Sequence, residues 1–439
     1  MEIAHQMSGA TSRTHSVRSQ PWSLYNNRQR AVFLGILFFV TTSSYFDYYI
    51  LSVVIEPLEQ EFHVSDTTLG LLSGFGFALV YASTALPFAR WADRGNRPTL
   101  IYLALGAWSV VTALCGLAQS FWQLALARLG VGLVEPGAVP PAQSLVADYF
   151  PPERRATASA VLIAGSSAGY LIGVGVGGCI AATFGWRAAF VFVGAPGVLL
   201  AVTAWLILPE PRAIIGFASV RPKSESIALV FLRLTQKRSF LYSLIGIATY
   251  TIFAYGVGGL FIPSFMIRTL HASLTQVSLT WGVAISVANL LGAVVGGWSA
   301  DRLRRTDIRW YVWLPAIACA LGAPLYWIAL SMQQLLTFII PAFLAEFVLS
   351  AGISVSYVPF LSVSGQAQRT TAIAIVQLSC LLIGAGLGPF IAGLLSDILH
   401  SLYGVDSLRY SLTTLVGVLL PAAAAFCWAG RTLPNDLED

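Results

Sequence analysis

The most constraining feature of this sequence is a series of apolar stretches of about 20 residues, each long enough to cross a hydrocarbon layer of about 30 Å as a helix. Of the 439 residues, 56% are hydrophobic and only 10% are charged. Soluble domains carry about 25% charged residues, so water is not the main solvent of this chain. The sequence therefore predicts an all-α membrane protein.

Twelve transmembrane helices are predicted, six on each side of a polar linker. The first six lie at 31–55, 69–89, 99–117, 121–147, 158–182 and 186–208. The second six lie at 240–266, 277–300, 310–331, 335–361, 371–398 and 410–430. The expected domains are a tail at 1–30, a bundle at 31–208, the linker at 209–239, a second bundle at 240–430 and a tail at 431–439.

Lysine and arginine are distributed unevenly between the two sides of the predicted bundles. If both termini and the linker lie inside, 21 of the 25 basic residues lie on the inner side, and short loops rich in these residues stay in the cytoplasm. The first apolar segment is too long for a signal-peptide core and has no small-residue cleavage site after it. We therefore predict a multi-pass protein of the cell membrane, the inner membrane if bacterial, with both termini cytoplasmic.

An internal repeat relates the two halves at an offset of 208 residues. Residues 62–67 align without gaps to 270–275, and residues 92–97 align to 300–305. Polar residues match in register, which chance similarity between apolar segments does not explain. The repeat predicts two pseudo-symmetric six-helix bundles with the substrate site between them, near the middle of the bilayer.

The segments 89–97 and 297–305 each end a predicted helix on the inner side and follow the pattern Gly-x-x-x-Asp-Arg-x-x-Arg, with Ala89 replacing glycine in the first copy. In this pattern the sequence resembles the major facilitator superfamily, which implies transport by alternating access between two bundles. A carboxylate at a helix boundary can pair with arginine in a contact that breaks and reforms. We predict that such a gating latch is made by Asp93, Arg94, Arg97, Asp148, Asp301, Arg302 and Arg305.

Within that superfamily, the first half resembles the spinster-type transporters and their bacterial relatives. The resemblance rests on the segments 46–49, 92–97, 128–135 and 148–155. It implies an amphiphilic substrate such as a lysolipid, with proton coupling in some members. The chain departs from the family pattern at Tyr48, where arginine is usual.

Four charged residues lie inside predicted helices and away from the helix ends: Asp47, Arg128, Glu135 and Glu346. A charge at the bilayer centre costs at least about 2.5–3.5 kcal/mol unless it is paired or faces a cavity. Asp47 and Arg128 lie at similar depths and are expected to pair, and Glu135 shares a helix face with Arg128. We predict substrate binding by Arg128, Asp47 and Glu346, and proton coupling by Glu135 or Asp47. A structural ion pair is the alternative for Asp47 and Arg128.

Aromatic residues are further candidates for the substrate site: Tyr48, Tyr250, Tyr255, Trp281 and Tyr357. A polar tip on an apolar ring suits an amphiphile, although such residues often only pack or anchor a helix at the interface. Glycines at 165, 169, 173 and 177 form a stripe on one predicted helix, which favours close helix packing.

Other function classes find no support in the sequence. The five cysteines lie singly in apolar segments, so we expect neither a disulfide framework nor a metal site. No Walker loop occurs, no hydrolase or metalloprotease motif stands at a helix boundary, and no basic patch tracks nucleic acid, so we expect no enzyme activity and no cofactor. The favoured function is a monomeric, proton-coupled secondary transporter of an amphiphilic or anionic substrate. The alternatives are a proton-coupled importer of small aromatic or sugar acids and, more remotely, a non-transporting membrane sensor.

Overall fold

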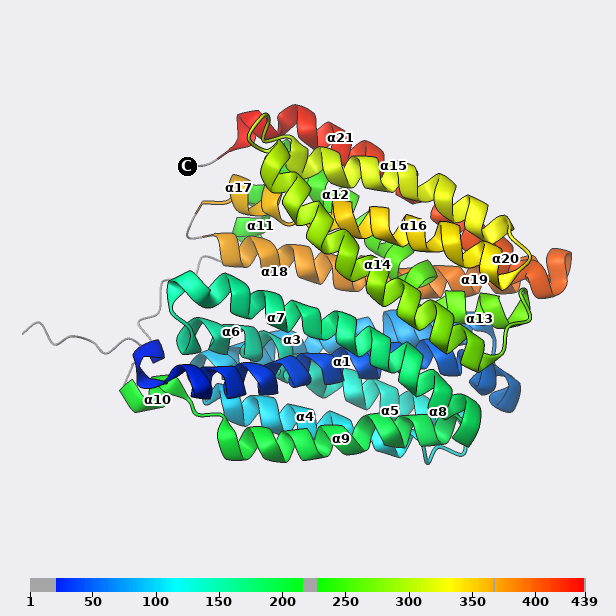
Figure 1. Cartoon of the computed structure of the whole chain (residues 1–439), viewed down its shortest axis with the longest axis horizontal. Helices are drawn as coiled ribbons and strands as arrows, with labels where there is room; N and C mark the ends of the chain where they lie inside the picture. Colours follow the sequence, from blue (N-terminus) through cyan, green and yellow to red (C-terminus); the bar gives the residue numbers. More distant parts are fainter. Residues whose placement is uncertain (1–20, 216–226, 366–367, 438–439) are drawn as a thin grey trace, which may run out of the picture.

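The computed structural model of the protein describes residues 21–215, 227–365 and 368–437, and within these ranges every regular element is a helix. The helices form twelve spans in two groups of six, which lie side by side along their length (Figure 1). The prediction of an all-α fold with twelve transmembrane helices in two bundles is confirmed. Among the described residues, ten helical stretches are long and apolar enough to cross a membrane; the broken fourth span is not one of them, and the last two spans count as one.

The first half contains six spans, of which the second, fourth and fifth change helix type along their length. The spans are α1 (Asn27–Phe62); α2 (Asp66–Gly70), η2 (Leu71–Gly76) and α3 (Phe77–Arg94); α4 (Arg97–Cys115); α5 (Phe121–Val134), η3 (Glu135–Gly137) and α6 (Val139–Tyr149); α7 (Pro152–Tyr170), η4 (Leu171–Val176) and α8 (Gly177–Phe184); and α9 (Trp186–Ile207). The short helices η1 (Pro21–Leu24) and α10 (Pro211–Ile215) flank this half.

The second half follows α11 (Ile227–Gln236), the described end of the linker. Its spans are α12 (Arg238–Phe253), η5 (Ala254–Phe261) and α13 (Ile262–Arg268); α14 (Leu274–Leu303); α15 (Trp310–Ser331); α16 (Leu335–Ile353) and α17 (Val358–Val363); α18 (Arg369–Ser379), η6 (Cys380–Leu387) and α19 (Gly388–Tyr403); and α20 (Ser407–Val416) with α21 (Leu419–Asp436). The short η7 (Gly404–Asp406) joins α19 to α20.

Four of the spans contain a π-helical segment, and these segments meet where the two halves touch. The segments η2 and η4 belong to the first half, and η5 and η6 belong to the second. η2 contacts η6, and η4 contacts α14 across the boundary. Because π-helical turns are rare and are frequent at functional sites, their position directs attention to the boundary between the halves.

The repeated segment forms the same turn in both halves. His63 and His271 have positive φ angles of 50° and 52°. Two residues later, Ser65 and Ser273 each cap the following helix by accepting a hydrogen bond from the backbone N–H three residues on. The offset of 208 residues therefore relates two copies of one local structure.

The glycine stripe brings the fifth span close to α1, as its spacing predicts. A Cβ atom on Gly169 would lie 2.6 Å from the carbonyl oxygen of Thr42. A Cβ atom on Gly177 would lie 2.3 Å from Ile50 Cδ1. Larger side chains on this face would push the two helices apart, so the stripe sets their packing distance.

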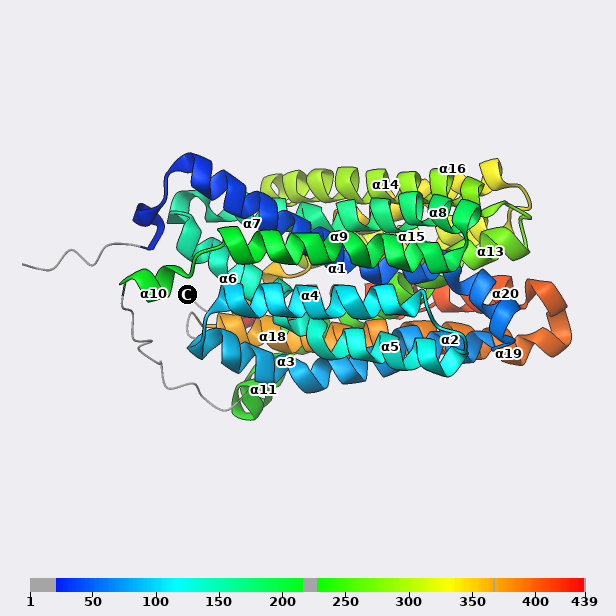
Figure 2. The same cartoon turned by 90° about the horizontal axis from the view of Figure 1, so that it is seen from below.

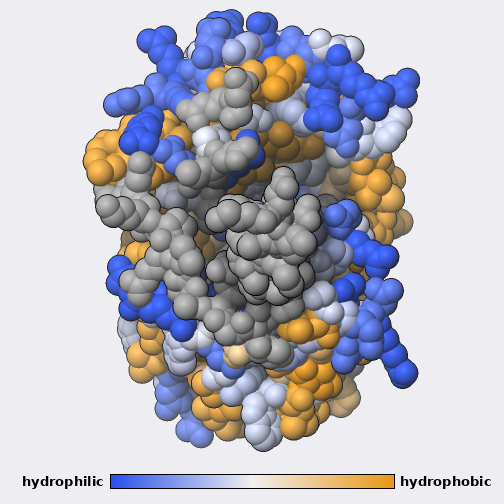
Figure 3. Space-filling view, turned by 90° about the vertical axis from the view of Figure 1, so that its left-hand side faces the viewer, coloured by the Kyte–Doolittle hydropathy of each residue, from blue (hydrophilic) through white to orange (hydrophobic). Residues whose placement is uncertain are grey.

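The two ends of the molecule differ. The start of α1, the end of α21, α10 and α11 lie at one end, which we call the terminal end (Figures 1 and 2). The end of α1 and helix α13, and with them His63 and Arg268, lie at the opposite end, which we call the far end (Figure 1). Hydrophilic side chains gather around the rim of the terminal end (Figure 3). The flanks carry large apolar side chains that remain exposed, for example at Leu126, Leu199 and Leu336, as expected of a surface that contacts lipid.

Candidate functional site

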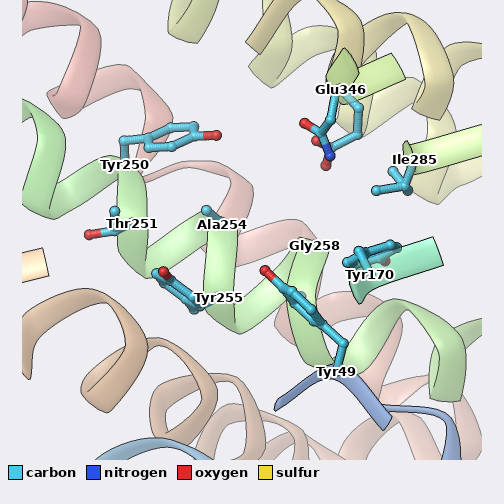
Figure 4. Close-up of a pocket in the computed structure, with 11 residues that line it drawn as sticks. Tyr49, Tyr170, Tyr250, Thr251, Ala254, Tyr255, Gly258, Ile285 and Glu346 are labelled. Atoms are coloured by element: carbon cyan, nitrogen blue, oxygen red, sulfur yellow. The ribbon is translucent and has the colours of Figure 1, made fainter. Parts of the chain in front are cut away.

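A cavity of about 200 Å³ lies between the two halves, and both halves contribute side chains to it. Its walls are made by Tyr49, Tyr170, Tyr250, Thr251, Ala254, Tyr255, Gly258, Gly259, Ile285, Asn289 and Glu346. Tyr49 and Tyr170 come from α1 and α7, and the remaining residues come from α12, η5, α14 and α16. Figure 4 shows Tyr250 and Glu346 facing each other across the space, with Tyr49, Tyr170 and Tyr255 below them.

Glu346 supplies the ionisable acid of this cavity. Its side chain is buried, and its carboxyl group accepts a hydrogen bond from the hydroxyl of Tyr326 on α15. A Cβ atom added to Gly258 would lie 3.1 Å from Glu346 Oε1, so the absence of a side chain there keeps the carboxyl open to the cavity. No Lys, Arg or His contacts Glu346 in the described part of the chain.

Aromatic rings continue from the cavity into the first half. The rings of Tyr49 and Tyr170 lie 4.5 Å apart, and those of Tyr48 and Tyr49 lie 5.0 Å apart. Tyr48 also contacts Tyr255 of the second half, at a ring distance of 5.9 Å. Tyr48 therefore does not line the cavity itself but packs behind its wall, next to the ion pair of the first half.

Asp47 and Arg128 form the expected ion pair, inside the first half. Arg128 Nη1 donates to Asp47 Oδ2 at 2.9 Å, and the hydroxyl of Thr112 donates to Asp47 Oδ1 at 2.5 Å. The two charged side chains are only 3% and 1% exposed. Neither residue lines the cavity, so in this conformation the pair neutralises itself and presents no free charge there.

Glu135 lies where the fourth span breaks. Sequence spacing predicted a continuous helix at 121–147, but Glu135, Pro136 and Gly137 form the 3₁₀ turn η3 between α5 and α6. Proline removes a backbone donor and disfavours a straight helix, which explains the break. The buried carboxyl of Glu135 accepts a hydrogen bond from the Ser44 hydroxyl of α1 instead of contacting Arg128.

The terminal end of the first half holds a buried arginine cluster. Arg97 is fully buried and donates to Asp148 at 2.6 Å and to Glu210 at 2.5 Å and 3.1 Å. Asp148 was an expected partner, whereas Glu210 was not. The predicted participation of Asp93 is not seen in this conformation, because Asp93 is exposed and has no hydrogen-bond or ion-pair partner among the described residues.

The equivalent residues of the second half form no buried cluster. Asp301 and Arg302 are exposed at the end of α14, and Arg305 is exposed just beyond it. Asp301 lies 4.0 Å from Arg304, a contact between two exposed groups. Arg94 is exposed as well. The two copies of the motif therefore share their position at a helix end, but only the first half has a buried arginine cluster. Whether these residues act in gating stays a prediction.

At the far end, the two halves are joined by Arg268, a residue that no sequence motif singled out. Arg268 of the second half donates to Asp66 at 2.8 Å and to Glu56 at 2.6 Å, and it also contacts Glu59, all from the first half. Next to it, Asp397 of α19 accepts from the backbone N–H of Asp66 and Thr67, at the start of α2. Among the described residues, every ion pair that joins the two halves involves Arg268.

Three of the predicted substrate-site residues line the cavity: Tyr250, Tyr255 and Glu346. Tyr357 lies at the start of α17 and is not part of the lining, and Trp281 is fully buried. Sequence reasoning missed several residues that do line the cavity or hold its acid, namely Tyr49, Tyr170, Thr251, Asn289 and Tyr326. The signal that could have found Tyr49 is its place in the segment 46–49, two residues after the charged Asp47.

Comparisons relate this chain to membrane transporters. Residues 37–327 match the model of the Major Facilitator Superfamily. The chain is 34% identical to an MFS-type efflux pump of Mycolicibacterium smegmatis, over 90% of this chain and 91% of that protein. It is 25% identical to the sphingosine-1-phosphate transporter SPNS2 of Xenopus tropicalis, over 96% of this chain and 87% of that protein. The crystal structure of a bacterial homologue of the human lysosomal transporter Spinster, inward-facing and unoccupied, is similar with a TM-score of 0.84 and 27% identity, over 94% of this chain and all of that one.

Proposed function

Since the chain belongs to the Major Facilitator Superfamily, we propose that it is a proton-coupled secondary transporter that exports an amphiphilic molecule by alternating access. The observation that carries this proposal is a cavity walled by both halves, in a molecule whose described residues join the halves by ion pairs at the far end and nowhere else. A cavity at such a boundary can face either side of the membrane as the halves rock against each other.

The contacts of Arg268 act as the far-end gate in this proposal. Three carboxylates of the first half surround one guanidinium of the second half, so separating the halves there breaks several charge-assisted hydrogen bonds. At the terminal end, the Arg97 cluster joins helices of the first half only. The conformation described here is therefore the one in which the far end is closed.

Proton coupling is assigned to the buried carboxyls of the first half. Glu135 and Asp47 lie inside membrane spans, where an ionised side chain is costly and is retained for function. Glu135 has a hydroxyl partner, Ser44, but no contacting cation in the described part of the chain, so it can hold or release a proton without breaking an ion pair. We therefore favour Glu135 over Asp47, whose charge is matched by Arg128.

The substrate class rests on the chemistry of the cavity and on the relatives. Tyrosines form much of its wall and offer apolar rings with polar tips, which suits a molecule with an apolar chain and a polar head. One relative is described as an efflux pump and another as a transporter of a phosphorylated sphingoid lipid. Together these favour a lysolipid-like substrate and the direction of export, over import of a small organic acid.

The orientation is proposed from charge, with the terminal end in the cytoplasm. Two threonines test it: Thr275, exposed at the start of α14 at the far end, and Thr306, exposed in the turn after α14 at the terminal end. In a background without the native cysteines, Thr275→Cys should react with an impermeant maleimide in intact cells, and Thr306→Cys should react only after lysis. The reverse pattern contradicts the orientation.

The test of the function is a transport screen in proteoliposomes with an imposed pH gradient. Labelled lysophosphatidylcholine, lysophosphatidic acid, and aromatic and sugar acids are compared with and without the gradient, and empty liposomes give the background. We expect gradient-stimulated movement of a lysolipid. Movement of hydrophilic acids alone favours the organic-acid importer, and movement of no compound in any condition contradicts a transport function.

A further inference from the structure

The cavity between the halves offers acidic, hydroxyl, amide and aromatic groups but no positive charge. None of its described lining residues is Lys, Arg or His, and Glu346 is its acid. An anionic head group in this cavity would meet a carboxyl group and no cation. The lining therefore does not favour an anion, which was one of the two substrate classes expected from the sequence.

Within the described ranges, the carboxyl of Glu346 faces only uncharged or weakly acidic partners. From α15 it receives the hydroxyl of Tyr326, and the tyrosines nearest to it on α12, α7 and α1 are Tyr250, Tyr170 and Tyr49. The elements α14 and η5 add the amide of Asn289, the hydroxyl of Tyr255 and backbone, none of which is a cation. A buried carboxylate without a positive partner is unfavourable, so the acid is satisfied either by a proton or by an incoming cation.

The nearest candidate for a positive partner is already engaged. Arg128 is bound to Asp47 inside the first half, and the ring of Tyr48 packs between this region and Tyr255 on the cavity wall. Drawing Arg128 into the cavity would leave Asp47 buried without its partner, which is costly. Arg128 is therefore not the partner of Glu346, and a positive charge that pairs with Glu346 is expected to come from the ligand.

We infer that Glu346 is a shared site for one proton and for the cationic group of the substrate, an ammonium or quaternary ammonium on an amphiphile. This inference rests on the transport function proposed above. When the cation enters, the carboxylic acid gives its proton to water on the open side, and the carboxylate pairs with the cation. One proton leaves for each cation bound, so charge balances. The faces of Tyr49, Tyr170, Tyr250 and Tyr255 attract the cation as aromatic rings do elsewhere.

The test uses three probes with the same phenylbutyl chain and different heads. These are phenylbutyltrimethylammonium, phenylbutanol and phenylpentanoate, titrated calorimetrically into the full-length protein in nanodiscs. Repeating the titration in buffers of different ionisation enthalpy counts the protons released. We expect saturable binding of the cation, at least tenfold tighter than that of the alcohol or the carboxylate. Release should approach one proton per cation bound, and binding should tighten as pH rises.

Variants separate a role of Glu346 from loss of fold. Glu346→Gln should weaken cation binding at least tenfold and abolish proton release, and Tyr250→Leu, which keeps the acid, should weaken binding several-fold with proton release retained. Glu61→Gln, the same change in an exposed ion pair with Arg187, should behave as wild type. Equal binding of the three probes, no saturable cation binding, or cation binding without proton release overturns the inference. Any of these results with lysolipid transport intact leaves the proposed function standing.

Discussion

Arg128 and Asp47 lie on different spans of the first half, yet the guanidinium and the carboxylate meet at 2.9 Å with almost no exposure. Because each charge compensates the other, removing one of them leaves an unpaired charge in a dry interior. Arg128→Ala or Asp47→Ala should therefore lower the free energy of unfolding by about 3–5 kcal/mol. The melting temperature of detergent-solubilised protein, followed by tryptophan fluorescence, measures this.

The double variant Asp47→Asn with Arg128→Gln removes both charges and should recover most of the stability lost in either single variant. If that variant is stable but transports at a much lower rate, the pair has a functional role beyond structure. If each single variant melts at the wild-type temperature, the pair is not the buried, mutually dependent contact described here.

The far-end gate predicts a change in conformational population. Each charge-assisted hydrogen bond of Arg268 contributes about 1.5–3 kcal/mol, so Arg268→Gln should shift the two-state equilibrium towards opening at the far end. Spin labels at Gln60 and Thr275, exposed residues on opposite halves, report this as a longer distance in pulsed electron resonance. Arg187→Gln is the matched control, because Arg187 pairs with Glu61 within the first half. An unchanged distance distribution for Arg268→Gln argues against a gate.

The contact between the fifth span and α1 predicts that an added methyl group lowers the stability of the protein at one glycine and leaves it unchanged at another. Gly169→Ala places a Cβ atom 2.6 Å from a backbone oxygen of α1, so the helices must separate, at a cost of about 1–3 kcal/mol. Gly35→Ala, on α1 itself, meets nothing within 4 Å and should be neutral or slightly stabilising. Thermal unfolding of the two variants side by side checks this, and equal melting temperatures contradict it.

The course of the spans could be predicted from sequence because hydrophobic length is a local property. Their ends were less predictable. The first helix, expected at 31–55, runs from Asn27 to Phe62. Asn26 and Gln29 form a capping box at its start, and its polar end carries Glu56 and Glu59, which reach Arg268. Hydropathy excluded the end of this helix because it is charged. The residue that compensates these charges, Arg268, lies far away in the chain and could not be identified from local sequence.

The candidate site shows the same limit. The pairing of Asp47 with Arg128 followed from equal depth, which sequence spacing gives directly. Arg97 was expected to act with Asp93 because both lie in one motif, but the fold buries Arg97 against Glu210 and turns Asp93 to solvent. The cavity wall depends on which faces of five different helical spans meet, and no local pattern in a single sequence encodes that.

The proposed coupling role of Glu135 predicts a separation between two transport modes. Glu135→Gln keeps a hydrogen-bonding group near Ser44 but cannot release a proton. It should lose transport driven by a pH gradient, while exchange of labelled for unlabelled substrate continues within a few-fold of wild type. Undiminished gradient-driven transport by this variant removes Glu135 from the coupling role and leaves Asp47 and the proton site inferred at Glu346 as the candidates.

The most direct test of coupled transport follows protons while substrate moves. Wild-type proteoliposomes enclose a pH-sensitive dye, the membrane potential is clamped with potassium and valinomycin, and the amphiphile selected by the transport screen is added on one side without a pH gradient. The account predicts a change of internal pH that requires both the protein and the substrate gradient, and that disappears when a proton carrier is added. Protein-dependent movement of the substrate with no change of internal pH would contradict proton coupling.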